Sequence, residues 1–112
     1  MEHLPIRYLL TAIVQEQDVD VAERALAVLE MPVIRLSSTG GFLGRRNATL
    51  LIGLPEGFAE QALAALRKSC RQRVEYLAIP MEGAPLPLPT PVPVTVGGAK
   101  VFALPVEHYE EI

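Results

Sequence analysis

Two kinds of hydrophobic pattern alternate along the chain, one with the period of a strand and one with the period of a helix. Residues 6–15 are apolar in both alternating sets of positions, which is typical of a strand covered on both faces. Residues 33–38, 49–54 and 74–79 are further short, largely apolar runs bounded by polar or turn-forming residues. We therefore predict four strands in the first eighty residues.

Two other segments carry apolar residues at helical spacing. The first begins near Asp18 and runs to about Met31, with Asp20 as the predicted N-cap and Glu23 three residues later as in a capping box. The second is predicted to begin with Pro55 in its first turn and to run to about residue 70.

The last third of the chain is rich in proline and glycine. Residues 80–93 hold six of the ten prolines, and because proline has no N–H this stretch is predicted to be a rim loop or a sheet edge rather than a central strand. Residues 94–96 and 101–104 flank Gly97-Gly98 and are predicted to form a hairpin with a two-glycine turn.

This order of elements predicts the fold class. Strand, helix, strand, strand, helix and strand, followed by a hairpin, is an α+β, ferredoxin-like βαββαβ arrangement with an extra C-terminal β-hairpin, in a single domain over residues 1–112. The helices would cover one face of the sheet. The other apolar face would be buried by association of copies into a closed ring.

The composition of the chain excludes several classes of partner and of location. Half of the residues are hydrophobic and the net charge is −3, which argues against DNA or RNA as partner because phosphate neutralisation needs a basic face. Cys70 is the only cysteine, so no internal disulfide forms, and we interpret it as a packing residue. No basic, apolar N-terminal leader and no apolar run of membrane-spanning length is visible, so we expect a cytoplasmic protein without membrane insertion.

A glycine-rich loop is predicted between the second and third strands. Gly40 and Gly41 allow positive φ and close approach of backbone N–H groups to a phosphate, although a Gly-Gly pair alone also fits a plain turn. Phe42 beside them can stack on an adenine, or can serve as a hydrophobic plug of the loop.

Three further positions carry suitable chemistry. Asn47 offers the donor and acceptor that read an adenine edge, or it closes the loop as a turn residue. Arg45 can pair with a phosphate, although loop arginines are often only solvated. Gly53 within a strand indicates close approach of a ligand or of another chain.

Several motifs together resemble the PII-like cyclic di-AMP receptors. They are Gln15-Glu16-Gln17-Asp18, Thr39-Gly40-Gly41-Phe42-Leu43, Asn47-x-Thr49, Gly53 and the stretch from Val96 to Val106. The resemblance implies a homotrimer with a ligand site in each cleft between copies, and loops that report the ligand to a downstream protein. It implies cyclic di-AMP as the ligand, with Thr39, Gly40, Gly41, Phe42, Leu43, Arg45, Asn47 and Gly53 as ligand-binding residues.

Four positions depart from that family pattern. Where the better-known members supply Asn, Arg and Thr from the strand entering the loop, this chain has Glu30, Pro32 and Ile34, and Glu111 stands where they have a glutamine. Pro32 and Ile34 offer no polar side chain, and Glu30 would repel a phosphate.

Three hypotheses follow. The first is a trimeric receptor for cyclic di-AMP, and the second is a structural or interaction trimer of the same fold that has lost this ligand or binds another nucleotide. The third, a metal-related trimer, is disfavoured because no Cys and His cluster at metal spacing. No nucleophile elbow, Walker loop or Rossmann fingerprint is present, so we expect neither an enzyme nor a cofactor or metal.

Overall fold

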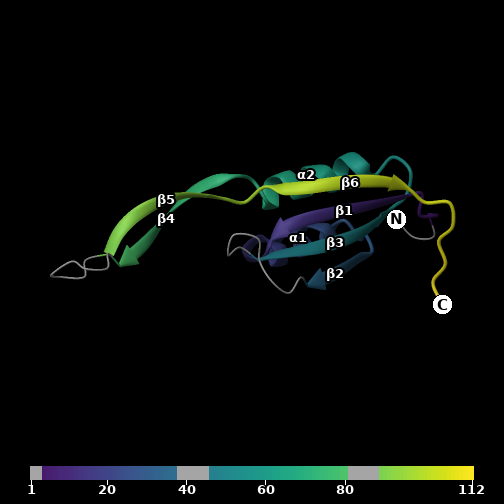
Figure 1. Cartoon of the computed structure of the whole chain (residues 1–112). Coiled ribbons are helices and arrows are strands. Elements are labelled where there is room, and N and C mark those ends of the chain that lie inside the picture. The colour runs from purple at the N-terminus through teal and green to yellow at the C-terminus, as the bar shows by residue number, and fades with distance from the viewer. Residues whose placement is uncertain (1–3, 38–45, 81–88) are drawn as a thin grey trace.

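A computed structural model of the chain describes residues 4–37, 46–80 and 89–112, which form six strands and two helices (Figure 1). In chain order the elements are β1 (Tyr8–Gln15), α1 (Glu16–Val28), β2 (Val33–Ser37), β3 (Asn47–Leu54), α2 (Ala59–Ser69), β4 (Arg73–Pro80), β5 (Pro89–Val96) and β6 (Ala99–Pro105).

The body of the molecule is a four-stranded antiparallel sheet with the order β2-β3-β1-β6. The two helices pack against each other and lie on one face of this sheet (Figure 1). This mixed α+β architecture is compatible with a ferredoxin-like fold.

The core lies between the sheet and the helices. Its strand side is made by every second residue of β1 and β3, among them Leu10, Val14 and Leu50, which are at most 1% exposed. Its helix side is made by Val19 and Leu26, which are completely buried, with smaller side chains around them. The period of two in the strands and of about four in α1 are the patterns that amphipathic elements need.

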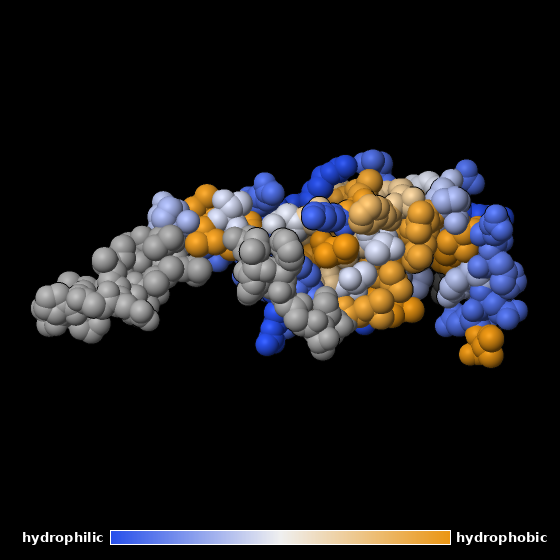
Figure 2. All heavy atoms as spheres, in the orientation of Figure 1, coloured by the Kyte–Doolittle hydropathy of each residue, from blue (hydrophilic) through white to orange (hydrophobic). Residues whose placement is uncertain are grey.

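The opposite face of the sheet, which we call the open face, is covered by neither α1 nor α2 and is largely apolar. It consists of the alternate residues of each strand: Leu9, Thr11, Ile13, Gln15, Ile34, Leu36, Asn47, Thr49, Leu51, Gly53, Lys100, Phe102 and Leu104. Ile34 is 61%, Phe102 56% and Leu104 53% exposed. Hydrophobic surface gathers over this body in Figure 2. An apolar face of this extent indicates an interaction surface.

Strands β4 and β5 form a separate two-stranded ribbon, the arm, that projects from the body and makes the molecule 65 Å long (Figure 1). Their antiparallel register runs from Arg73 opposite Val96 at the root to Pro80 opposite Pro89 at the far end. The prediction of an edge for the proline-rich stretch fits Pro89 to Pro93, since a two-stranded ribbon consists of edges, while residues 81–88 lie outside the described residues.

The root of the arm is fixed to the body by polar contacts. The guanidinium of Arg73 binds both carboxylate oxygens of the buried Asp18, at 2.9 and 3.4 Å. Directly after β5, the Gly97 N–H donates to the side-chain oxygen of Gln15 at 2.8 Å, and the Gly98 N–H donates to the carbonyl of Cys70. The start of β4 and the end of β5 are thus both held at defined positions on the body.

The predicted hairpin over residues 94–104 is wrong, although both of its strands exist. β5 pairs with β4 and β6 pairs with β1, so the two predicted partners belong to different sheets. Gly97 and Gly98 have φ of 87° and 85° and carry the chain from the arm onto the edge of the sheet. β6 therefore occupies the place beside β1 in which the fourth strand of a ferredoxin-like sheet is expected.

Both predicted helix starts are also wrong. α1 begins at Glu16, directly after β1, so Asp20 is not an N-cap but lies within the helix, where it pairs with Arg35 of β2 at 2.8 Å. α2 begins at Ala59, and Pro55 instead belongs to the preceding turn, in which its carbonyl accepts from the Phe58 N–H at 3.4 Å. Asp20 and Pro55, the residues that predicted these helix starts, thus make contacts near the helix ends without defining them.

Candidate functional site

The described residues include two of the eight predicted ligand-binding positions, and both belong to β3. Asn47 is its first residue and Gly53 its last but one, on the same open face and, at about 3.4 Å per residue, roughly 20 Å apart. The other six, Thr39, Gly40, Gly41, Phe42, Leu43 and Arg45, lie outside the described residues.

Asn47 lines a cavity at the root of the arm, the arm-root cavity, of about 320 Å³. Its half-buried side chain lies opposite Gln15, the last residue of β1, because these two strands pair in register. The remaining lining residues come from β1, β6 and the two connections at the arm root: Ile13, Gln72, Gly97, Gly98, Ala99 and Lys100.

The described residues that line the arm-root cavity combine amides with an ammonium group. Asn47, Gln15 and Gln72 supply carboxamide groups, which can each donate and accept, and Lys100 supplies an ammonium group. Gln15 is held in place because its side-chain oxygen accepts the Gly97 N–H. Such a set of groups suits a nucleotide, because amides can read the edge of a base and a nearby cation can pair with a phosphate.

Three of these residues, Gln15, Gln72 and Lys100, are not among the predicted site residues. Gln15 belongs to a motif that the resemblance singles out, and its position at the polar end of an apolar strand is a usable signal. Lys100 gave no such signal, because it reaches the cavity only through the pairing of β6 with β1, which the sequence pattern did not indicate.

Gly53 is approached closely by its own chain. A Cβ atom at this position would lie 3.1 Å from Ile6 Cδ1 and 3.3 Å from Pro32 Cγ, so a side chain here would displace both. Its N–H donates to the Pro32 carbonyl at 3.0 Å. Packing within the chain therefore accounts for a glycine at this position.

Three of the four positions that depart from the family pattern meet in a second cavity, the tail cavity, of about 320 Å³. Glu30, Pro32 and Glu111 line it together with Tyr109, Leu4, Ile6 and Pro55. Glu30 has a φ of 59°, which places the residue in the left-handed region after the C-terminus of α1. The two carboxylates disfavour a phosphate at this place. Ile34 stands apart, exposed on the open face.

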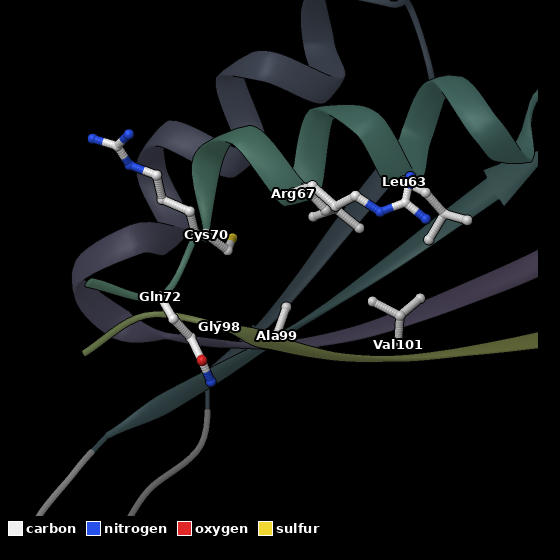
Figure 3. Close-up of a pocket in the computed structure, with 9 residues that line it drawn as sticks. Leu63, Arg67, Cys70, Gln72, Gly98, Ala99 and Val101 are labelled. Carbon is white, nitrogen blue, oxygen red and sulfur yellow. The ribbon is translucent and has the colours of Figure 1, made fainter. Parts of the chain in front are cut away.

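A third cavity, of about 380 Å³, lies between α2 and β6 (Figure 3). Leu63, Arg67 and Cys70 face Ala99 and Val101 across it (Figure 3). Burial, with a smaller contribution from the Asp18 carboxylate, raises the pKa of the Cys70 thiol to about 11. The thiol is therefore uncharged near neutral pH and unsuited to act as a nucleophile, which agrees with its predicted packing role.

Two other kinds of site are absent from residues 4–37, 46–80 and 89–112. No group of three or more His, Cys, Asp or Glu side chains there is arranged to hold a metal ion. Neither α1 nor α2 has the length and apolar character that a membrane-spanning helix needs.

Comparison with known proteins defines the family. The pattern of the cyclic-di-AMP receptor family matches residues 7–112, nearly the whole chain, and the chain therefore belongs to this PII-like family. A solved structure, that of a functionally unknown protein from Pediococcus pentosaceus, superimposes with a TM-score of 0.75 at 32% sequence identity. The match covers 96% of this chain and 98% of the other.

Proposed function

We propose that this protein is a signal-transduction receptor that binds cyclic di-AMP in clefts between the copies of a homotrimer. In this proposal it is a cytoplasmic, non-enzymatic protein whose ligand state is passed to a downstream protein. Membership of the cyclic-di-AMP receptor family supports the ligand class. The open face supports association, because copies that cover it would bury side chains such as Phe102 and Ile34.

The arm-root cavity is the single observation that carries the proposal for this chain. Asn47, singled out in the sequence for its adenine-reading chemistry, lies there beside Gln15 and Lys100 at the edge of the open face. A ligand at this place would be partly enclosed when a second copy covers that face. Thr39, Gly40, Gly41, Phe42, Leu43 and Arg45 are proposed to complete the contacts. Gly53 is proposed to contribute through its backbone at the far end of β3, where Ile6 and Pro32 of its own chain lie close to it.

The tail cavity favours a second candidate, a trimer of the same fold that binds another ligand or none. Glu30 and Glu111 bring negative charge to positions at which the better-known family members carry polar groups. Loss of a few such contacts, at about 1–3 kcal/mol each, would weaken binding by several orders of magnitude.

Calorimetric titration of the purified protein with cyclic di-AMP, with ATP and cyclic di-GMP alongside, separates the two candidates. We expect micromolar or tighter binding of cyclic di-AMP, near one ligand per chain. Absence of heat with all three nucleotides, from a folded protein, would reject the receptor and support the second candidate.

Truncation of Asn47 tests the residues of the site. Asn47→Ala removes one donor and one acceptor, so we expect cyclic di-AMP affinity to fall by about 10- to 100-fold. Gln61→Ala is the matched control, because it truncates an exposed amide on α2 and should leave affinity unchanged. Unchanged affinity of Asn47→Ala with a normal fold would exclude this amide from the site.

A further inference from the structure

The two long edges of the arm differ in their capacity to accept another strand. β5 carries proline at three successive alternate positions, Pro89, Pro91 and Pro93. In an antiparallel ribbon, alternate residues direct their N–H and C=O groups toward the partner strand, and the residues between them direct these groups outward. The three prolines therefore point the same way.

The register of the arm shows whether the nitrogens of these three prolines face β4 or the outer edge. Tyr76 pairs with Pro93, Ala78 with Pro91 and Pro80 with Pro89. A proline has no N–H to give to the ladder, so these pairs are the non-hydrogen-bonded ones and the proline nitrogens face outward. The outer edge of β5 thus lacks a donor at three successive outward positions, which blocks strand addition.

The outer edge of β4 is open by the same reasoning. Val74, Tyr76 and Ala78 direct their N–H and C=O groups outward, and each has a hydrogen to donate. In the described part of the chain no strand pairs with this edge. A two-stranded ribbon is at best marginally stable alone, and a third or fourth strand would stabilise it.

We propose that the β4 edges of two copies pair antiparallel about a two-fold axis and join their arms into a four-stranded sheet. The second copy can offer only its own β4 edge, because its β5 edge is blocked in the same way. The product ends in a proline-blocked β5 on either side, so the assembly closes at two arms.

The outward groups of β4 match one another in this arrangement. With the axis at Tyr76, Tyr76 pairs with the partner's Tyr76, and Val74 pairs with the partner's Ala78. Every outward N–H of these three residues then meets a carbonyl. The pairs between them set Glu75 opposite the partner's Leu77, so like charges do not face each other.

The exposed side chains near the arm root agree with such pairing. Val74 is 56% and Tyr76 70% exposed, and they share one face of the ribbon. A two-fold axis perpendicular to the sheet keeps this face common to both copies. The two Tyr76 rings would then lie side by side, since hydrogen-bonded pairs have Cα atoms about 5.5 Å apart.

Proline substitutions test the edge without removing bonds of the arm itself. Ala78→Pro deletes an outward N–H of β4, and Thr95→Pro deletes an outward N–H of β5. In sedimentation at high protein concentration, we expect the wild type and Thr95→Pro to have twice the mass of Ala78→Pro. A unit of several bodies carries one arm per copy, so the twofold ratio applies when all of its arms pair with those of one second unit. Any larger assembly formed through the arms is likewise expected to be absent from Ala78→Pro, and the test needs no nucleotide.

Amide exchange followed by NMR supplies the second readout. We expect the Tyr76 N–H to exchange more slowly as wild-type concentration rises, and to show no such change in Ala78→Pro. Equal masses of the wild type and Ala78→Pro, with Tyr76 exchange independent of concentration, would overturn the proposal and leave the edge open to an extended segment of another protein.

Unblocking β5 gives the opposite test. The double variant Pro91→Thr, Pro93→Val restores two outward donors, so β4 of one copy can pair with β5 of the next without closing. We expect a broad series of larger assemblies in place of one doubled species. A double variant that still stops at the doubled mass would show that the prolines do not limit the assembly.

Discussion

Cys70 shows how the environment of one residue decides its chemistry. It caps the C-terminus of α2 and is 2% exposed, between the helix and the sheet. Its carbonyl accepts the Gly98 N–H, so its backbone holds the link to β6 while its thiol fills space. A lone cysteine in the sequence is compatible with packing or with reactivity, and burial decides for packing.

The raised pKa of Cys70 predicts a loss of stability at alkaline pH. The folded protein keeps the thiol proton to a pKa of about 11, whereas the ordinary value is 9.0. Stability from this source is therefore complete below pH 9 and falls as pH rises from 9 to 11, by roughly 2–3 kcal/mol at most. Urea unfolding across this range should show a smaller decline for Cys70→Ala, and parallel curves for the two proteins would contradict the assignment.

At the scale of elements, the link from the arm to β6 depends on Gly97. Gly97 and Gly57 have nearly equal φ, 87° and 88°. A Cβ atom on Gly97 would overlap the carbonyl oxygen of Arg71, whereas one on Gly57 meets nothing within 4 Å. The same substitution at the two positions therefore separates conformational strain from overlap.

We expect Gly57→Ala to lower the free energy of unfolding by about 1–2 kcal/mol through strain alone. Gly97→Ala should lower it by about 1–3 kcal/mol more, because the Arg71 carbonyl must move. Urea unfolding followed by circular dichroism measures both. An equal loss of unfolding free energy in both variants would mean that the Arg71 carbonyl moves away from the new Cβ atom without destabilising the fold.

The elements themselves were largely predictable from the sequence, but their partners were not. The apolar runs located β1 to β4 and β6, because alternation and β-branched residues are local signals. Of β5 they located only residues 94–96, since its proline-rich first part indicated a loop or a sheet edge. The pairing of β6 with β1 joins residues far apart in the sequence, so local patterns do not indicate it. A Gly-Gly pair between two strands resembles a hairpin turn even where, as here, it links two sheets. For the same reason Asn47 was found from its residue type, and Lys100, which reaches the cavity through that pairing, was missed.

At the scale of the whole molecule, the open face is what the sequence anticipated best. Both alternating sets of β1 are apolar, and the structure buries one set under the helices and leaves the other half-buried on the open face. An apolar face of this extent on a chain of 112 residues indicates an interaction surface. The face and the arm are separate surfaces, so association through each can be tested alone.

Charge placed on the open face tests the proposed trimer. Phe102→Lys would bury an ammonium group against apolar side chains of another copy, a cost that dissociation avoids. In the Ala78→Pro background, in which arm pairing is absent, we expect the mass to fall from that of a trimer to that of a monomer with the fold retained. Val28→Lys is the matched control, because Val28 is 81% exposed on α1, away from the open face, and this variant should remain trimeric. Dissociation of both variants, or of neither, would mean that the apolar open face does not hold the copies together.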